Sequence, residues 1–292
     1  MENYRELGRK LNACVRKQMG KALFGFFVLS MLETFILSFF MTPVLLVSKN
    51  GKASVFDMIA TAVSLYAGFI VILVLQYGYH VLIVRLVRGD YATVGYLFEG
   101  FRSRRRIFPA AVLYAIGLTA ALVVCQIAAF FLDKRLSAFS DAFGLPLLLL
   151  CVVSVFVVLS LAILVKFSFV WLCLYDNPAL KVPAAFGKSV RLLRHRAFRL
   201  IGFVLYAGGR HLIVAVAMFA ASMIVPASTG AALSLLAFVL EFVYFVAAYS
   251  AVVRMFMAIP VFYDSIVIRP TDAGKLQMPS VAELPGPDSG AE

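Results

Sequence analysis

The sequence has little charge and a large share of apolar residues. Only 14% of its 292 residues are Asp, Glu, Lys or Arg, whereas 63% are hydrophobic. Ordinary soluble domains are about 25% charged and about 45–50% apolar. The polar surface that a water-soluble fold would need is therefore missing, and the mean hydropathy of +0.95 indicates a membrane protein.

Residues that build disulfides, metal centres or soluble active sites are also scarce. The four cysteines have no paired spacing, and the three histidines have no metal-ligand spacing. Gly187-Lys188-Ser189 has the form of the end of a phosphate-binding loop, but position 182 is Val where that loop needs Gly. We therefore expect no disulfide, metal site, cofactor or catalytic residue, and we do not expect an enzyme.

Six apolar runs are long enough to cross a hydrocarbon layer, which needs about 20 residues per helix. They are continuous rather than alternating, so they predict helices rather than barrel strands. The runs are 22–47, 55–84, 107–132, 145–174, 200–225 and 231–262. The expected fold class is all-α, with a six-helix membrane domain at 22–268. A basic amphipathic cytoplasmic segment, 1–21, precedes this domain, and a disordered cytoplasmic tail, 269–292, follows it.

Positive charge is distributed unevenly between the two sides of this expected domain. All but five of the 27 Lys and Arg residues lie before the first run, in the second and fourth loops, or on the side of the tail. The positive-inside rule therefore places both termini in the cytoplasm. The net charge of +12 could instead indicate nucleic-acid binding, but that would require a basic face on a water-soluble module. We expect the lipid bilayer and its anionic headgroups as partners, and no nucleic acid.

A unit of about 87 residues occurs three times, which is typical of repeat architectures. The units end at Asp90, Asp176 and Asp264, which are 86 and 88 positions apart, and ten positions before them stand His80, Lys166 and Arg254. We expect three hairpin repeats, at about 1–90, 91–176 and 177–264, each with a short amphipathic interfacial helix before its hairpin.

Two interpretations of these six repeat positions remain open. The aspartates could close the helix ends and pair with the basic segments that follow. Alternatively, three Asp and three basic groups could form a ring around a pseudo-threefold axis, as a cytoplasmic vestibule for a charged solute.

Three charged residues lie deep within the expected membrane helices, where charge is costly. At 1.5 Å per residue, Arg210 lies about 16 Å from Arg199, and Glu33 lies about 18 Å from Lys21. By the same rise, Glu241 lies about 20 Å from Arg254. We expect Arg210 to pair with one or both glutamates, either as a structural ion pair or as a solute or proton site at the midplane.

Several short motifs resemble one family of bacterial membrane proteins. The motifs are Leu86-Val87-Arg88-Gly89-Asp90, the run 97–102, Tyr175-Asp176-Asn177-Pro178 with Ser189 downstream, and Pro260-Val261-Phe262-Tyr263. The family is known as domain of unknown function nine-seven-five, and the chain is also similar to the membrane portion attached to some glycerophosphodiester phosphodiesterases. The resemblance covers positions 20–268. It implies a multi-pass protein of the bacterial cytoplasmic membrane with no assigned activity, and it adds no catalytic residue.

The sequence therefore favours an integral membrane protein that binds or moves a small or lipidic ligand. The alternative is a structural or accessory protein that docks a cytoplasmic or membrane partner. A ligand-handling protein should place Arg210, Glu33 or Glu241 on a water-accessible cavity, whereas an accessory protein should have a dry, packed bundle. The identities of the ligand and of protein partners, and the oligomeric state, stay open.

Overall fold

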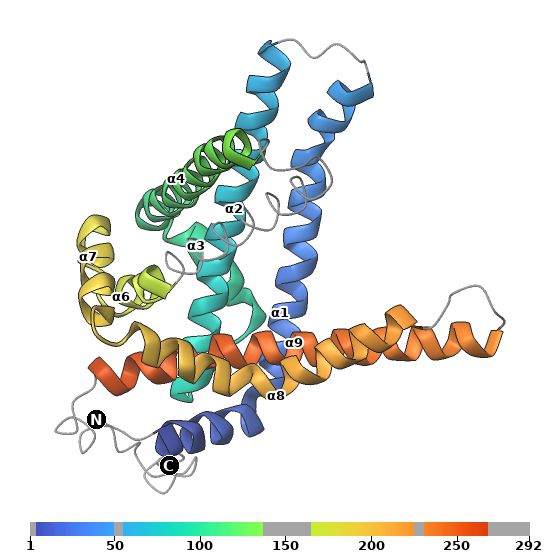
Figure 1. Ribbon diagram of the computed structural model, residues 1–292. Helices are drawn as coiled ribbons and strands as arrows, with labels where there is room; N and C mark the ends of the chain where they lie inside the picture. The colour runs from blue at the N-terminus through green and yellow to red at the C-terminus, as the bar shows by residue number, and fades with distance from the viewer. Residues whose placement is uncertain (1–3, 50–54, 137–164, 225–230, 268–292) are drawn as a thin grey trace, which may run out of the picture.

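The computed structural model describes residues 4–49, 55–136, 165–224 and 231–267, and this part of the chain is helical without strands (Figure 1). The expected all-α class is confirmed for these residues. The elements are α1 (Tyr4–Lys49), α2 (Val55–Arg88), the 3₁₀ helix η1 (Val94–Phe98), α3 (Glu99–Arg102), α4 (Arg104–Leu136), α6 (Val170–Asp176), α7 (Val182–Leu193), α8 (Ala197–Ile224) and α9 (Ala231–Val267).

Four of these helices contain segments that are long and apolar enough to cross a membrane. The segments are Tyr4–Thr42, Ile59–Arg88, Ala197–Ser222 and Ala237–Val267. Six spans were expected. The third expected run, 107–132, lies within α4, which is not one of the four helices with such a segment. The fourth expected run, 145–174, lies outside the described residues as far as position 164. The structure thus supports a membrane protein with several spans, while six spans in three repeats stay a prediction.

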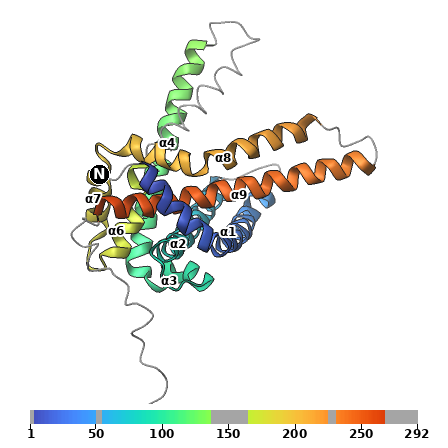
Figure 2. The ribbon, with the colours of Figure 1, turned by 90° about the horizontal axis from the view of Figure 1, so that it is seen from below.

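The long helices converge at one end of the molecule and diverge from there. Figure 1 shows the α1–α2 hairpin and the α8–α9 hairpin leaving the converging end in different directions, and Figure 2 shows α4 pointing in a third direction. In α1, the amphipathic segment and the first apolar run form one continuous helix, whose first part runs at an angle to the rest (Figure 1). Both described ends of the chain, at α1 and α9, lie at the converging end.

The packed core lies at this converging end. Among its fully buried large side chains are Tyr79 of α2, Phe169 beside α6, Phe203 of α8 and Tyr263 of α9. The residues of η1 and α3 pack directly on α2, because Gly78 lies against the carbonyl of Leu97 and would have no space for a Cβ atom. The core thus joins elements from all parts of the chain, as one hydrophobic cluster.

The diverging arms expose large apolar side chains instead of burying them. Phe35 and Phe56 of the first hairpin are 70% and 78% exposed, and Ile213 and Phe238 of the last hairpin are 72% and 66% exposed. Soluble monomers rarely carry contiguous apolar surfaces of this extent. A lipid environment around the arms removes this surface from water, which is the physical reason to treat them as membrane-embedded.

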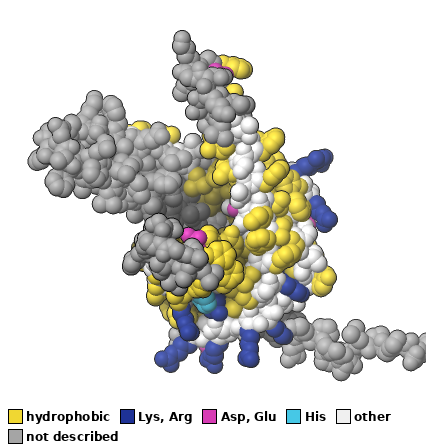
Figure 3. Space-filling model, turned by 90° about the vertical axis from the view of Figure 1, so that its right-hand side faces the viewer, with side chains coloured by type: hydrophobic (Ala, Val, Ile, Leu, Met, Phe, Trp, Pro, Cys, Tyr) yellow, Lys and Arg dark blue, Asp and Glu magenta, His cyan; other side chains and the backbone are white. Residues whose placement is uncertain are grey.

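Charge is segregated in the way that the sequence predicts. In the space-filling view, Lys and Arg side chains line the lower edge of the described surface and also occur on its right-hand edge, beside a broad area of hydrophobic side chains (Figure 3). The positive-inside rule applies to charge distributions of this kind.

Candidate functional site

The most closely organised charged group of the described residues is centred on Arg88, in the last turn of α2. Its guanidinium contacts Asp176, at the end of α6, through Nη1–Oδ1 at 2.7 Å and Nη2–Oδ2 at 3.2 Å. It also contacts Asp264, in the last turn of α9, through Nη2–Oδ1 at 2.7 Å and Nε–Oδ2 at 3.2 Å. One arginine therefore holds two carboxylates, and we call these three residues the Arg88 cluster.

The chemistry of the Arg88 cluster follows from the planar fork of the guanidinium. Arginine presents several N–H donors in a fixed geometry that matches carboxylates, and such paired hydrogen bonds are stronger than neutral ones. The side chains of Arg88, Asp176 and Asp264 are 25%, 22% and 18% exposed, so water screens them only in part. The cluster carries a net charge of −1, and Asp176 also has a side-chain hydrogen bond with Tyr263 of α9, which fits a connection between helix ends rather than a reactive centre.

Local sequence places Arg88 at the helix end. Gly89 has a φ of +83°, a left-handed conformation that suits glycine and ends α2 directly after Arg88. The amide of Asp90 then donates to the carbonyl of Arg85 at 2.9 Å, which satisfies one of the free carbonyls of the last turn.

The end of α6 is held by a second arginine. Nη2 of Arg106 donates to the carbonyl of Leu174 at 2.8 Å and to that of Asn177 at 3.2 Å. The carbonyl of Leu174 is at the end of the helix, so Arg106 acts as a side-chain cap, whereas the carbonyl of Asn177 also accepts from the amide of Leu180 at 3.0 Å. Asp176 is thereby fixed from both the α2 and the α4 side.

The structure brings two of the three repeat aspartates together and leaves the third out. Asp176 and Asp264 both contact Arg88. The side chain of Asp90 is exposed, and its backbone amide donates to the carbonyl of Arg85. These contacts do not form a ring of six charged groups. The interpretation as ion pairs that close helix ends agrees with them, although the cation comes from the helix end of the first repeat rather than from a following basic segment.

The three basic repeat positions lie apart from these aspartates. His80 is buried against the ring of Phe256, with ring centroids 5.3 Å apart, Lys166 is exposed, and Arg254 lies on α9 near α8. Within the described ranges, no ion pair joins any of the three to a repeat aspartate. Arg88 was the residue that sequence reasoning missed as a site residue. Its position two residues before Asp90, in a helix-ending Arg-Gly-Asp, was the available signal.

The three charged residues that were expected to meet near the midplane do not meet. Oε1 of Glu33 accepts a hydrogen bond from Nε2 of Gln76 at 3.2 Å, between α1 and α2. Arg210 and Glu241 are both exposed, and no ion pair joins Arg210 to either glutamate in the described part of the chain.

The register of the last hairpin explains the separation of Arg210 from Glu241. Gly208 lies against Ala251 and Met255, so Arg210 is level with about position 251 of α9. Glu241 is ten residues further along the hairpin, or about 15 Å at the helical rise. Depth counted separately from each helix end could not reveal this offset.

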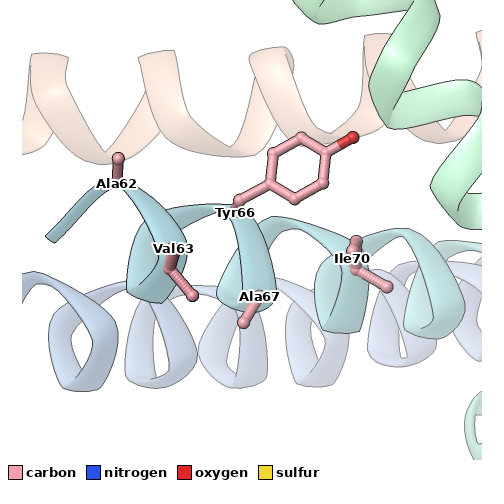
Figure 4. Close-up of a pocket in the computed structure, with 5 residues that line it drawn as sticks. All are labelled: Ala62, Val63, Tyr66, Ala67 and Ile70. Carbon is pink, nitrogen blue, oxygen red and sulfur yellow. The ribbon is translucent and has the colours of Figure 1, made fainter. Parts of the chain in front are cut away.

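An apolar groove lies along one face of α2 (Figure 4). It has a volume of about 420 Å³ and is lined by Ala62, Val63, Tyr66, Ala67 and Ile70. Figure 4 shows these side chains on successive turns of one helix, with the hydroxyl of Tyr66 as the polar atom among them. The groove can take an apolar chain, but it offers no group for acid–base or nucleophilic chemistry. Among the residues described, no group of three or more His, Cys, Asp or Glu residues could hold a metal ion.

The fold and these sites define a helical protein whose long apolar helices suit a membrane and whose charged groups join helix ends. No family model, no curated protein and no solved structure matches the chain. The resemblance to the family known as domain of unknown function nine-seven-five therefore rests on its short motifs alone.

Proposed function

We propose that this chain is a multi-pass protein of the bacterial cytoplasmic membrane that binds a lipidic ligand and is not an enzyme. The observation that carries the proposal is the contrast between the two ends of its helices. At the converging end the helices are packed and joined by the Arg88 cluster, while further out the arms diverge and expose their apolar side chains.

The apolar groove on α2 supports a lipidic ligand over a small polar one. Its lining is aliphatic apart from Tyr66, so burial of an acyl chain would be favourable, whereas a polar solute would lose hydration without replacement hydrogen bonds. The basic edge at the converging end supports an acidic headgroup, because lysine and arginine near a bilayer attract anionic lipid by about 1 kcal/mol each.

Native mass spectrometry of the purified chain in mild detergent, with lipid extraction alongside, tests this function. We expect a discrete bound lipid at a fixed ratio to the protein, which survives collisional removal of detergent. A broad distribution of bulk lipids that is lost with the detergent would contradict the proposal.

A second candidate is an accessory protein that docks a partner at its converging end. The Arg88 cluster favours it, because a paired, partly buried set of charges gives rigidity and offers no solute pathway. Site-specific crosslinking from exposed Lys166 in intact membranes would distinguish the two. One discrete protein adduct together with an absence of bound lipid would favour docking over ligand binding.

A further inference from the structure

The last hairpin holds a group of two arginines and a histidine that the proposed function does not yet use. Arg210 and His211 lie on α8, and Arg254 lies on α9. Arg210 and Arg254 are each thirteen residues from the converging end of their helix, at Ala197 and Val267. The two arginines are therefore at similar levels, although the sequence alone had placed one at the midplane and the other at the boundary.

The contact between α8 and α9 confirms that these levels agree. A Cβ atom on Gly208 would lie 2.7 Å from Met255 and 2.9 Å from the carbonyl of Ala251, so the helices touch closely there. Arg210 is thus level with about position 251, only about 4.5 Å along the axis from Arg254. Because helical side chains lean toward the N-terminus of their own helix, the two side chains of this antiparallel pair lean toward each other's level.

The charges in this group repel each other and have no acid to balance them. Arg210 acts electrostatically on both His211 and Arg254, and Arg254 acts on His211. No carboxylate of the described residues lies within ion-pair distance of Arg210 or Arg254. A set of like charges this close is unfavourable in the free protein, and an anion would relieve the repulsion.

Two nitrogen atoms of the group are enclosed by the protein and have no hydrogen-bond partner. They are Nδ1 of His211 and Nε of Arg254. Buried polar groups in folded proteins are normally hydrogen-bonded. These two nitrogen atoms therefore have a hydrogen-bonding capacity that the described residues do not satisfy. This observation is independent of the charge repulsion, and it shows that the group has unused hydrogen-bonding capacity.

We propose that Arg210, His211 and Arg254 form a binding site for a phosphate-bearing anion, such as the headgroup of an anionic phospholipid. This inference rests on the proposed lipid-binding function and adds the headgroup chemistry to it. Arginine suits this role, because its fork contacts phosphate oxygens through paired hydrogen bonds. Arg210 is exposed on the arm, which gives a lipid lateral access to the site.

The test is a titration of the full-length chain in mild detergent with phosphatidylglycerol, with phosphatidylcholine as the zwitterionic comparison, followed by native mass spectrometry. The variants are Arg210→Gln, Arg254→Gln and the pair together. Glu241→Gln is the control, because Glu241 is exposed on the same hairpin, ten residues from the level of Arg210, and the change also alters one charge. Arg210→Lys keeps the charge, and the elution volume and melting midpoint of every variant report whether it folds.

We expect each site variant to bind phosphatidylglycerol about tenfold more weakly, as for one lost charge-assisted hydrogen bond, while Glu241→Gln stays near wild type. Arg210→Lys should retain part of the affinity. A parallel titration with inorganic phosphate identifies the source: if the same variants lose phosphate binding and keep lipid binding, the site takes free phosphate.

Equal affinities in wild type, both site variants and the control, for both probes, would overturn the site. This result is distinct from failure of the proposed function, in which wild type binds neither lipid. In that event the phosphate titration still decides whether the three residues bind an anion.

Discussion

At the scale of single residues, one arginine, Arg88, joins the ends of α2, α6 and α9 by pairing with two of the repeat aspartates. Arg88 contacts Asp176 and Asp264 with four hydrogen bonds, and its Cζ also lies 5.9 Å from the centre of the Tyr175 ring. Removal of the guanidinium would leave two carboxylates facing each other in a partly buried space. The free-energy cost is then the loss of the contacts plus the repulsion that remains.

Arg88→Ala should lower the free energy of unfolding by about 1–3 kcal/mol, below the 3–5 kcal/mol of a fully buried pair because water screens the cluster in part. Unfolding in mixed micelles, followed by circular dichroism, measures the change. Arg102→Ala is the matched control, since Arg102 lies 3.7 Å from Glu99 but its side chain is 77% exposed. An Arg88→Ala protein as stable as the Arg102→Ala protein would show that the cluster contributes little.

The source of the Arg88→Ala effect can be separated by a second change. Adding Asp176→Asn to Arg88→Ala removes the carboxylate repulsion, so we expect part of the stability to return. Arg88→Lys should be intermediate, because it keeps the charge and loses the planar fork. No recovery in the double variant would mean that the lost hydrogen bonds, and not the repulsion, account for the effect.

At the scale of elements, close backbone contacts hold the short helices of the first loop on α2. Gly78 of α2 meets the backbone carbonyl of Leu97 in η1, and Gly100 of α3 meets the backbone of Val74. Backbone atoms cannot move aside in the way that a flexible side chain can. These two glycines therefore determine how near η1 and α3 lie to α2.

Gly78→Ala should destabilise the protein by about 1–3 kcal/mol, as expected for an added methyl group in a packed contact. Gly117→Ala on α4 is the control, because nothing lies within 4 Å of its Cβ position. Alanine is the better helix former by about 1 kcal/mol, so the control should keep or gain stability. The melting midpoints of both variants in one detergent measure the difference, and equal midpoints would contradict the close contact.

At the scale of the whole molecule, the converging end carries the packed core and the basic edge, while the arms carry the exposed apolar surface. This polarity gives the protein one end suited to water and headgroups and another suited to lipid. From the positive-inside rule we predict that the converging end lies in the cytoplasm.

Labelling of single cysteines tests this orientation. In a variant without its native cysteines, Ala179→Cys places a thiol at an exposed position between α6 and α7, at the converging end. A membrane-impermeant maleimide should label it only in inverted vesicles. Ala53→Cys, between α1 and α2, should be labelled only from the other side. Labelling of both thiols from one side would contradict a transmembrane α1–α2 hairpin.

The sequence by itself determined the properties that depend on local composition. Continuous apolar runs predicted helices, because a backbone in lipid must form its hydrogen bonds within the segment. Asp90, Asp176 and Asp264 all lie within three residues of the ends of α2, α6 and α9, while the three repeats stay a prediction. These are properties of neighbouring residues, so one sequence is sufficient to show them.

The tertiary structure alone decided which distant residues meet. Arg88, rather than His80, Lys166 or Arg254, joins Asp176 to Asp264, and Arg210 lies level with Arg254 rather than with Glu241. Each of these outcomes depends on the register between helices that are far apart in the chain. Register is set by close contacts such as Gly208 against Ala251, and a shift of a few residues along a helix moves a charge by several ångströms, at about 1.5 Å per residue, which is enough to change its partner.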